Sequence, residues 1–252
     1  MSEDRCLFTG ARASAPLLLK PFACLAAMLA AMLVFLGATA IASPAPTFTT
    51  LFAFNGSDGV MPNSLVQGLN GDLYSDDEQG DFFSITTSGV FKPIGLAPDS
   101  NVVGPMVYPN GDFFMAAPNG EENGGEIVRV TPAGKTTDLY NFCENDNCAH
   151  GEHPFAGLVE GTNGNLYGTT ARGGAGDEGT VFEVSPTSKN KITLLYSFCV
   201  QAGCPDGSTA YYGLVLGTDG NFYGTTNQGG TNNLGTILQD HSRGGFDNAP
   251  QL

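Results

Sequence analysis

The residues with the clearest capacity for chemistry are four cysteines arranged as two C-x4-C pairs. Cys143 and Cys148 form the first pair, and Cys199 and Cys204 form the second pair 56 residues later. Four cysteines allow three pairings. A disulfide needs Cα atoms within ~7 Å of each other, and equivalent positions in neighbouring repeats should lie much farther apart. We therefore predict two local disulfides, Cys143–Cys148 and Cys199–Cys204.

The first cysteine pair is also followed by two histidines, which gives the pattern C-x4-C-x-H-x2-H. Cys143, Cys148, His150 and His153 are of the residue types that bind structural zinc. The second pair keeps its cysteines without any histidine, so the cysteines need no metal to explain them. Export also favours oxidation of the thiols. Zinc is therefore the alternative to a disulfide, and we predict no metal and no cofactor.

Little else in the sequence indicates catalysis. It contains no G-x-S-x-G, H-E-x-x-H or P-loop motif, and we predict no catalytic residue. The cluster Asp76-Asp77-Glu78 has the carboxylate oxygens that Ca²⁺ prefers, but a solvated loop is the simpler interpretation.

The formal net charge is −15, and loss of residues 1–42, with three basic and two acidic side chains, leaves −16. So acidic a surface disfavours nucleic acid and anionic membranes as partners.

The cysteine pairs belong to a repeat that organises most of the chain. Residues 157–186 read GLVEGTNGNLYGTTARGGAGDEGTVFEVSP, and residues 213–238 read GLVLGTDGNFYGTTNQGGTNNLGTIL, with an offset of 56 residues. A fixed period of this size marks an array of one supersecondary unit. Two more divergent copies precede these, and the matching aromatic residues of the four copies are Tyr74, Phe114, Tyr167 and Tyr223.

Each copy contains short apolar runs separated by turn residues. In the third copy the runs are residues 158–159, 166–170, 180–184 and 191–198. Asn163-Gly164 and Asp219-Gly220 indicate tight hairpin turns, because Gly adopts positive φ without a steric penalty and Asn or Asp tolerates it. The run at 180–184 is β-branched and aromatic, as strands prefer. The pattern predicts an all-β fold of tandem four-stranded antiparallel units, packed as a four-bladed or an incomplete β-propeller.

The motif GLVxGTxGNxYGTTxxGG resembles the extracellular tandem repeat of the family called choice-of-anchor tandem repeat GloVer-containing proteins. The resemblance covers roughly residues 47–238. It implies export and a repeat-built architecture, and it carries over no catalytic residue. The pattern G-x-D-G-N-x-Y also resembles, more distantly, the blades of streptogramin-lyase-like propellers.

The N-terminal residues have the pattern of a secretory signal peptide. Arg5, Arg12 and Lys20 precede an uncharged apolar segment at residues 22–42, which ends in two small-x-small sites. We predict a signal peptide at residues 1–42, with an uncleaved anchor as the alternative because the segment is long enough to span a bilayer. A secreted, cell-surface or periplasmic protein is expected, without membrane contact after cleavage. The repeat domain should occupy residues 43–238, followed by an irregular tail at residues 239–252.

The two ends of the repeat domain differ from its middle. The fourth copy lacks its fourth apolar run, whereas residues 47–54 resemble such a run without the three that should precede it. We predict that residues 47–54 pair with residues 236–238 and close a ring. The alternative is an array cut from a longer one.

These features favour an exported, non-enzymatic binding or scaffold module whose extracellular ligand is a carbohydrate or a protein. The alternative is a propeller enzyme of the lyase or hydrolase type, with its chemistry at the axis on loops from several blades. A histidine and a carboxylate converging at the axis would favour the enzyme.

Overall fold

The computed structural model describes residues 47–96, 102–119, 124–144, 146–241 and 245–247, so the predicted signal peptide lies outside the described residues. The chain divides into two compact units, of which the second, Thr50–Leu252, holds every described strand. We describe this unit by itself. No helix in the described part of the chain has the length and apolarity needed to cross a membrane.

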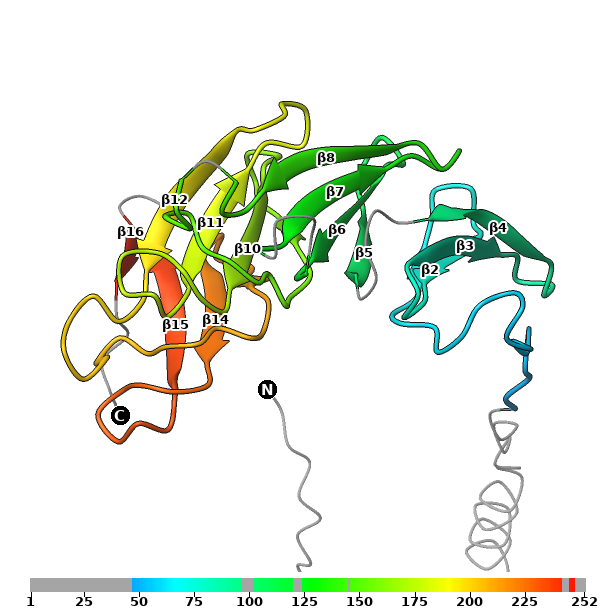
Figure 1. Ribbon diagram of the computed structural model, residues 1–252. Coiled ribbons are helices and arrows are strands. Elements are labelled where there is room, and N and C mark those ends of the chain that lie inside the picture. Colours follow the sequence, from blue (N-terminus) through cyan, green and yellow to red (C-terminus); the bar gives the residue numbers. More distant parts are fainter. Residues whose placement is uncertain (1–46, 97–101, 120–123, 145, 242–244, 248–252) are drawn as a thin grey trace, which may run out of the picture. The chain divides into compact units, whose positions relative to one another are not determined.

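Within the described residues, four antiparallel sheets of four strands each follow one another along the chain (Figure 1). Each is a meander in which consecutive strands are neighbours, which confirms the predicted all-β architecture. Sheet 1 contains β1 (Val66–Gln67), β2 (Leu73–Asp76), β3 (Asp81–Ile85) and β4 (Phe91–Leu96). Sheet 2 contains β5 (Val103–Val107), β6 (Phe113–Ala117), β7 (Glu126–Val130) and β8 (Thr136–Asn141). Sheet 3 contains β9 (Val159–Glu160), β10 (Leu166–Thr170), β11 (Thr180–Val184) and β12 (Ile192–Ser197). Sheet 4 contains β13 (Val215–Leu216), β14 (Phe222–Thr226), β15 (Thr236–His241) and β16 (Gly245–Asp247).

The turn between β9 and β10 shows how the Asn-Gly pair forms a hairpin. Gly164 has a φ of 77°, and its N–H donates to the carbonyl oxygen of Gly161 at 3.0 Å. Asn163 does not adopt positive φ; its side-chain oxygen instead accepts a hydrogen bond from the N–H of Asn165 at 3.0 Å. Only the glycine therefore needs the left-handed conformation, whereas the asparagine stabilises the turn through its side chain.

Alternate residues of the second strand in each sheet face opposite neighbours. In β10, Leu166 packs in the cluster between sheets 2 and 3, whereas Tyr167 packs in the cluster between sheets 3 and 4. This is the two-residue period of a β-strand, and it leaves all five residues of β10 buried. Aromatic rings meet across the junctions: the centroids of Tyr74 and Phe113 lie 4.4 Å apart, and those of Tyr167 and Phe222 lie 4.3 Å apart.

The repeated Tyr-Gly-Thr-Thr sequence is explained by packing and by hydrogen bonds. A Cβ atom on Gly168 would lie 2.6 Å from the ring of Phe182, so only glycine leaves room for that ring. The Thr170 hydroxyl accepts a hydrogen bond from the N–H of Thr180 at 3.0 Å, and the Thr180 hydroxyl donates to the carbonyl of His150 at 2.9 Å. Sheet 4 repeats the two hydroxyl contacts at Thr226 and Thr236. The two threonines therefore fasten the loops that enter sheets 3 and 4.

The predicted closing strand is wrong. Residues 47–54 form no strand in the described chain. On its outer edge β15 pairs with β16 through Gln239, Asp240 and His241, which lie just beyond the residues 236–238 of the predicted pairing. The tail predicted to be irregular from residue 239 onward thus supplies the end of one strand and a second short strand. Its sequence has no apolar pattern because the pairing uses backbone groups, which any residue can supply.

The apolar residues near Thr50 pack instead on sheet 1. The rings of Phe54 and Phe83 have centroids 5.2 Å apart. This contact matches the one between Phe142 and Phe182, at 5.3 Å, by which the end of sheet 2 packs on sheet 3. Residues 47–54 therefore resemble the end of a fourth strand in their packing as well as in their sequence. The sheet on which Phe54 packs is the one that follows it in the chain.

Candidate functional site

Both cysteine pairs form disulfides within the loops that lead from one sheet to the next. Cys143–Cys148 and Cys199–Cys204 each have a Cα–Cα separation of 4.1 Å. All four cysteines adopt positive φ, from 47° to 66°, a conformation that is uncommon for residues other than glycine. Closing a loop this short contributes about 2 kcal/mol in the chain-entropy model. The disulfides therefore hold the two loops in an unusual backbone conformation.

A carboxylate anchors each disulfide loop to the outer strand before it. The Tyr140 hydroxyl donates to Asp146 at 2.8 Å, and the Tyr196 hydroxyl donates to Asp206 at 2.9 Å. His150 occupies the position equivalent to Asp206, and its ring contacts Asp146. Burial, and then the hydrogen bond to Asp146, raises the pKa of Tyr140. Burial opposes ionisation of Asp146, but the hydrogen bonds with His150 and Tyr140 outweigh it and lower the pKa of Asp146.

These contacts do not assemble the zinc site considered as an alternative. The two sulfur atoms of the first pair are bonded to each other, and His153 Nδ1 lies 2.8 Å from the carbonyl oxygen of Pro118. A carboxylate oxygen of Glu152 lies 3.6 Å from each sulfur. Disulfide sulfurs, however, lack the thiolate charge that binds a metal. The cysteines and histidines of this sequence pattern therefore serve separate contacts.

The acidic cluster that was interpreted as a solvated loop is mostly buried. Asp76 and Asp77 are 0% exposed, whereas Glu78 is exposed. Asp77 Oδ1 accepts hydrogen bonds from the N–H groups of Gln79 and Asp81, both at 2.9 Å. Asp77 thus takes the role that the Thr170 hydroxyl has in sheet 3. The solvated interpretation is wrong for the two aspartates because these backbone donors draw Asp77 into the fold.

Asp76 is the buried carboxyl group with the weakest hydrogen bonding in this cluster. Its Oδ2 accepts a hydrogen bond from Asn63 Nδ2 at 2.7 Å, while its Oδ1 has no partner among the described residues. Burial raises the pKa of Asp76 from 3.8 to about 6, against the opposing effect of the Asn63 hydrogen bond. A buried carboxylate with one uncompensated oxygen favours the protonated form.

Asp76→Asn should therefore change how stability depends on pH. The folded protein binds the Asp76 proton more tightly than the unfolded chain, so stability from this group is fully present below about pH 4 and is lost as pH rises through about 6. Because Asn cannot ionise, the free energy of unfolding of the variant should be about 1–3 kcal/mol higher than that of the wild type at pH 7.5. The two values should be equal at pH 4. Urea unfolding at both pH values measures this. A difference of the same size at the two pH values would contradict the buried titration.

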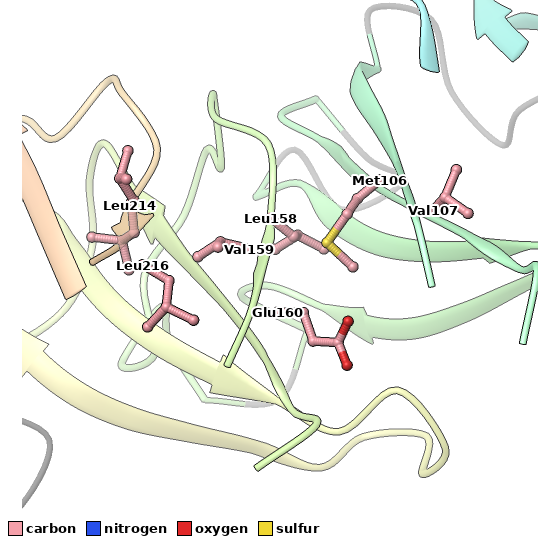
Figure 2. A pocket seen from close by; sticks show the side chains of 8 residues that line it. Met106, Val107, Leu158, Val159, Glu160, Leu214 and Leu216 are labelled. Carbon is pink, nitrogen blue, oxygen red and sulfur yellow. The ribbon is translucent and has the colours of Figure 1, made fainter. Parts of the chain in front are cut away.

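A groove lies along the first strands of sheets 2, 3 and 4. It has a volume of about 580 Å³, and strands β9 and β13 contact each other beside it. The lining residues are Met106, Val107, Leu158, Val159, Glu160, Leu214, Val215 and Leu216 (Figure 2). They occupy matching positions in successive copies, just after Gly104, Gly157 and Gly213. The repeat thus gathers residues more than fifty positions apart along one groove.

The groove has an apolar surface with one charged group. Seven of the eight lining side chains are apolar, and the exception is Glu160, which is half-buried. Leu158 and Leu214 are 8% and 7% exposed, whereas Val215 is 65% exposed. The lining can hold an apolar group and offers a single anionic contact to it. Neither His150 nor His153 is among the described lining residues, because both lie in the disulfide loop.

Sequence reasoning did not predict this groove. The signal was present in the three residues after the first glycine of copies two, three and four, which are Pro-Met-Val, Leu-Val-Glu and Leu-Val-Leu. These residues indicate a short strand, and the first strand of a sheet has one side without a neighbouring strand. Copy three differs from copies two and four by having Glu160 at the position that is Val107 and Leu216 in those copies.

The fold and the series of sheets define the chain as a β-propeller protein. The chain belongs to the Gloeobacter/Verrucomicrobia repeat family, whose model matches residues 75–248. No curated protein matches the chain in sequence.

Solved structures resemble the chain at low sequence identity. A catalytically inactive variant of virginiamycin B lyase from Staphylococcus aureus, solved with quinupristin, is 19% identical with a TM-score of 0.50, over 76% of this chain and 56% of the lyase chain. A gluconolactonase from Xanthomonas campestris is 14% identical with a TM-score of 0.47, over 75% of this chain and 62% of that one. The chain therefore spans little more than half the length of these structures, and the likeness to the lyase concerns the fold alone.

Proposed function

We propose that this chain is an exported, non-enzymatic propeller module that binds an apolar group of an extracellular ligand. The observation that carries the proposal is the groove along β5, β9 and β13, whose lining is apolar at seven of eight positions. Ligand pockets in proteins are mainly apolar, with a few polar groups that orient the ligand. Glu160 is the charged group in this groove and gives the ligand its orientation.

Export is supported by the cysteine chemistry and by the surface charge. Both pairs of cysteines that lie in the repeats are oxidised, as is usual for proteins outside the cytosol. A predicted mature charge of −16 maintains solubility and disfavours nucleic acid. Each disulfide braces a loop between sheets, so oxidation stabilises the array that forms the groove.

The propeller-enzyme alternative requires a base and an electrophilic or acidic partner in the same groove. In the described lining, Glu160 is the one titratable side chain. Binding requires no such pair, and the groove already has the shape and apolar surface that it needs. Binding is therefore the function we retain.

Val215→Asp tests the groove with little risk to the fold, because Val215 is 65% exposed. With the neutral apolar dye Nile red as probe, we expect the variant to bind about tenfold more weakly than the wild type, because an apolar ligand would desolvate the new charge. Val200→Asp is the matched control, since Val200 is 62% exposed but lies in the second disulfide loop. Fluorescence titration of the three proteins gives the affinities. Equal affinity in all three would contradict the groove as the binding site.

A further inference from the structure

Sheet 4 has an exposed apolar residue at a position that is buried in the other three sheets. The second residue of the third strand faces the following sheet in sheets 1, 2 and 3: Phe82, Ile127 and Val181 are 1%, 0% and 0% exposed and pack in the clusters shared with sheets 2, 3 and 4. The equivalent residue of sheet 4 is Ile237, and it is 71% exposed. Ile237 therefore lies on the face that every other sheet buries against its successor.

On sheet 1, the exposed apolar residue lies on the opposite face, the one that points away from sheet 2. Leu158 and Leu214, which precede β9 and β13, are 8% and 7% exposed because they pack against the preceding sheet. The equivalent residue of sheet 1 is Leu65, and it is 55% exposed. Leu65 borders an apolar pocket of about 230 Å³ that the buried Phe83 and Ile85 also line, and residues 51, 52 and 54 of the preceding segment form another part of its lining. This pocket corresponds to the surface that receives the preceding sheet elsewhere in the array.

Ile237 and Leu65 occupy the two halves of a junction that the chain already forms three times. At each internal junction, the successor-facing residue of one sheet packs among the predecessor-facing residues of the next. We propose that sheet 4 of one copy of this chain docks on sheet 1 of a second copy, with Ile237 packed against Leu65 and the adjoining pocket. The occupant is a second copy because its sheet 1 is built on the pattern that receives such a residue.

This contact is head-to-tail, because it joins sheet 4 of one copy to sheet 1 of the other. Two copies can form two such junctions with each other. A head-to-tail interface forms a closed ring when the rotation permits and a filament when it does not. Two copies supply eight sheets, which is within the four to eight blades of closed propellers. In the dimer, β1 of the partner would follow β13 and extend the row of strands beside the groove.

Ile237→Asp should convert the protein from a dimer to a monomer. The full chain, expressed for export, is measured by light scattering coupled to size-exclusion chromatography across a concentration series. We expect the wild type to be a dimer at micromolar concentration, and Ile237→Asp to dissociate at least about tenfold more readily because it places a charge in an apolar junction. Leu234→Asp is the matched control, since Leu234 is 85% exposed and precedes β15 in the same sheet. A monomeric wild type, or an unchanged Ile237→Asp dimer, would overturn the proposal.

A mixing experiment distinguishes the pairing of Ile237 with Leu65 from an interface in which Ile237 of one copy meets Ile237 of the other. Leu65→Asp should also be monomeric, because each junction needs Ile237 of one copy and Leu65 of the other. Mixing it with Ile237→Asp restores one intact junction, so dimers containing one copy of each variant should form. Failure of this complementation would show that Ile237 and Leu65 do not meet across the interface, and it would overturn the proposal. Thermal melting of each variant verifies that the monomers are folded.

Discussion

Phe182→Ala should lower the free energy of unfolding by about 3–5 kcal/mol, which is a large part of the 5–15 kcal/mol that stabilises a typical domain. Phe182 is 0% exposed and packs in the cluster that joins sheets 2 and 3. Its ring centroid lies 5.3 Å from that of Phe142. Truncation removes buried apolar surface and leaves a cavity between two sheets, which cannot collapse because both are held by their own hydrogen bonds. Chemical denaturation gives the loss directly.

Leu194→Ala is the matched control for Phe182. Leu194 is paired with Phe182 across strands β11 and β12, but it is 37% exposed. Its truncation should lower the free energy of unfolding by about 1 kcal/mol, because little of its surface leaves a buried site. A loss for Phe182→Ala no larger than that for Leu194→Ala would show that the junction between sheets does not limit stability.

The second large effect is expected for Gly151→Ala, with a loss of about 3–5 kcal/mol. Gly151 has a φ of 107°, a backbone conformation that residues other than glycine rarely adopt. A Cβ atom there would also collide with the hydroxyls of Thr170 and Thr180, which fasten the entering loop to sheet 3. The substitution therefore combines backbone strain with disruption of the hydrogen bond from Thr180 to the carbonyl of His150. Thermal and urea unfolding should both report the loss.

Gly220→Ala separates the two causes. Gly220 has a φ of 83°, but a Cβ atom there would meet nothing within 4 Å. Its substitution should therefore lower stability by about 1–2 kcal/mol, through backbone strain alone. If Gly151→Ala and Gly220→Ala cause equal losses, the threonine hydroxyls do not confine the backbone at residue 151.

The features that were predictable from the sequence depend on local spacing. The strands of sheet 3 begin and end close to the apolar runs at 158–159, 166–170, 180–184 and 191–198, because turn residues separate them. The pairing of Cys143 with Cys148 follows from the short loop between them. Both inferences needed only the residues near each element and a second copy for comparison.

The features that were not predictable depend on contacts between distant segments. Asp76 is buried although two acidic residues follow it in the sequence, and Asn63, thirteen residues earlier, donates a hydrogen bond to it. The groove combines residues from three copies, and no single copy contains it. The expected closing strand was misplaced because an apolar run does not show which of two sheets its phenylalanine contacts. Phe54 has the same local sequence pattern as Phe142, but only the fold shows that each packs on the following sheet.

The hydrogen bond from the Thr180 hydroxyl to the carbonyl of His150 has a consequence for how such a chain can be shortened or lengthened by recombination. It ties the linker that leaves sheet 2 to the interior of sheet 3, just as the Thr236 hydroxyl ties the carbonyl of Asp206 to sheet 4. The unit that recombination could exchange therefore does not coincide with one sheet. It starts with the phenylalanine after an outer strand, continues through the disulfide loop, and ends in the outer strand of the sheet that follows. Crossovers inside β12 and its counterpart β8 preserve every such tie, whereas crossovers between a disulfide loop and the sheet that follows it sever one. The segment ending at Phe54 is the opening part of one such module, joined to the sheet that it serves.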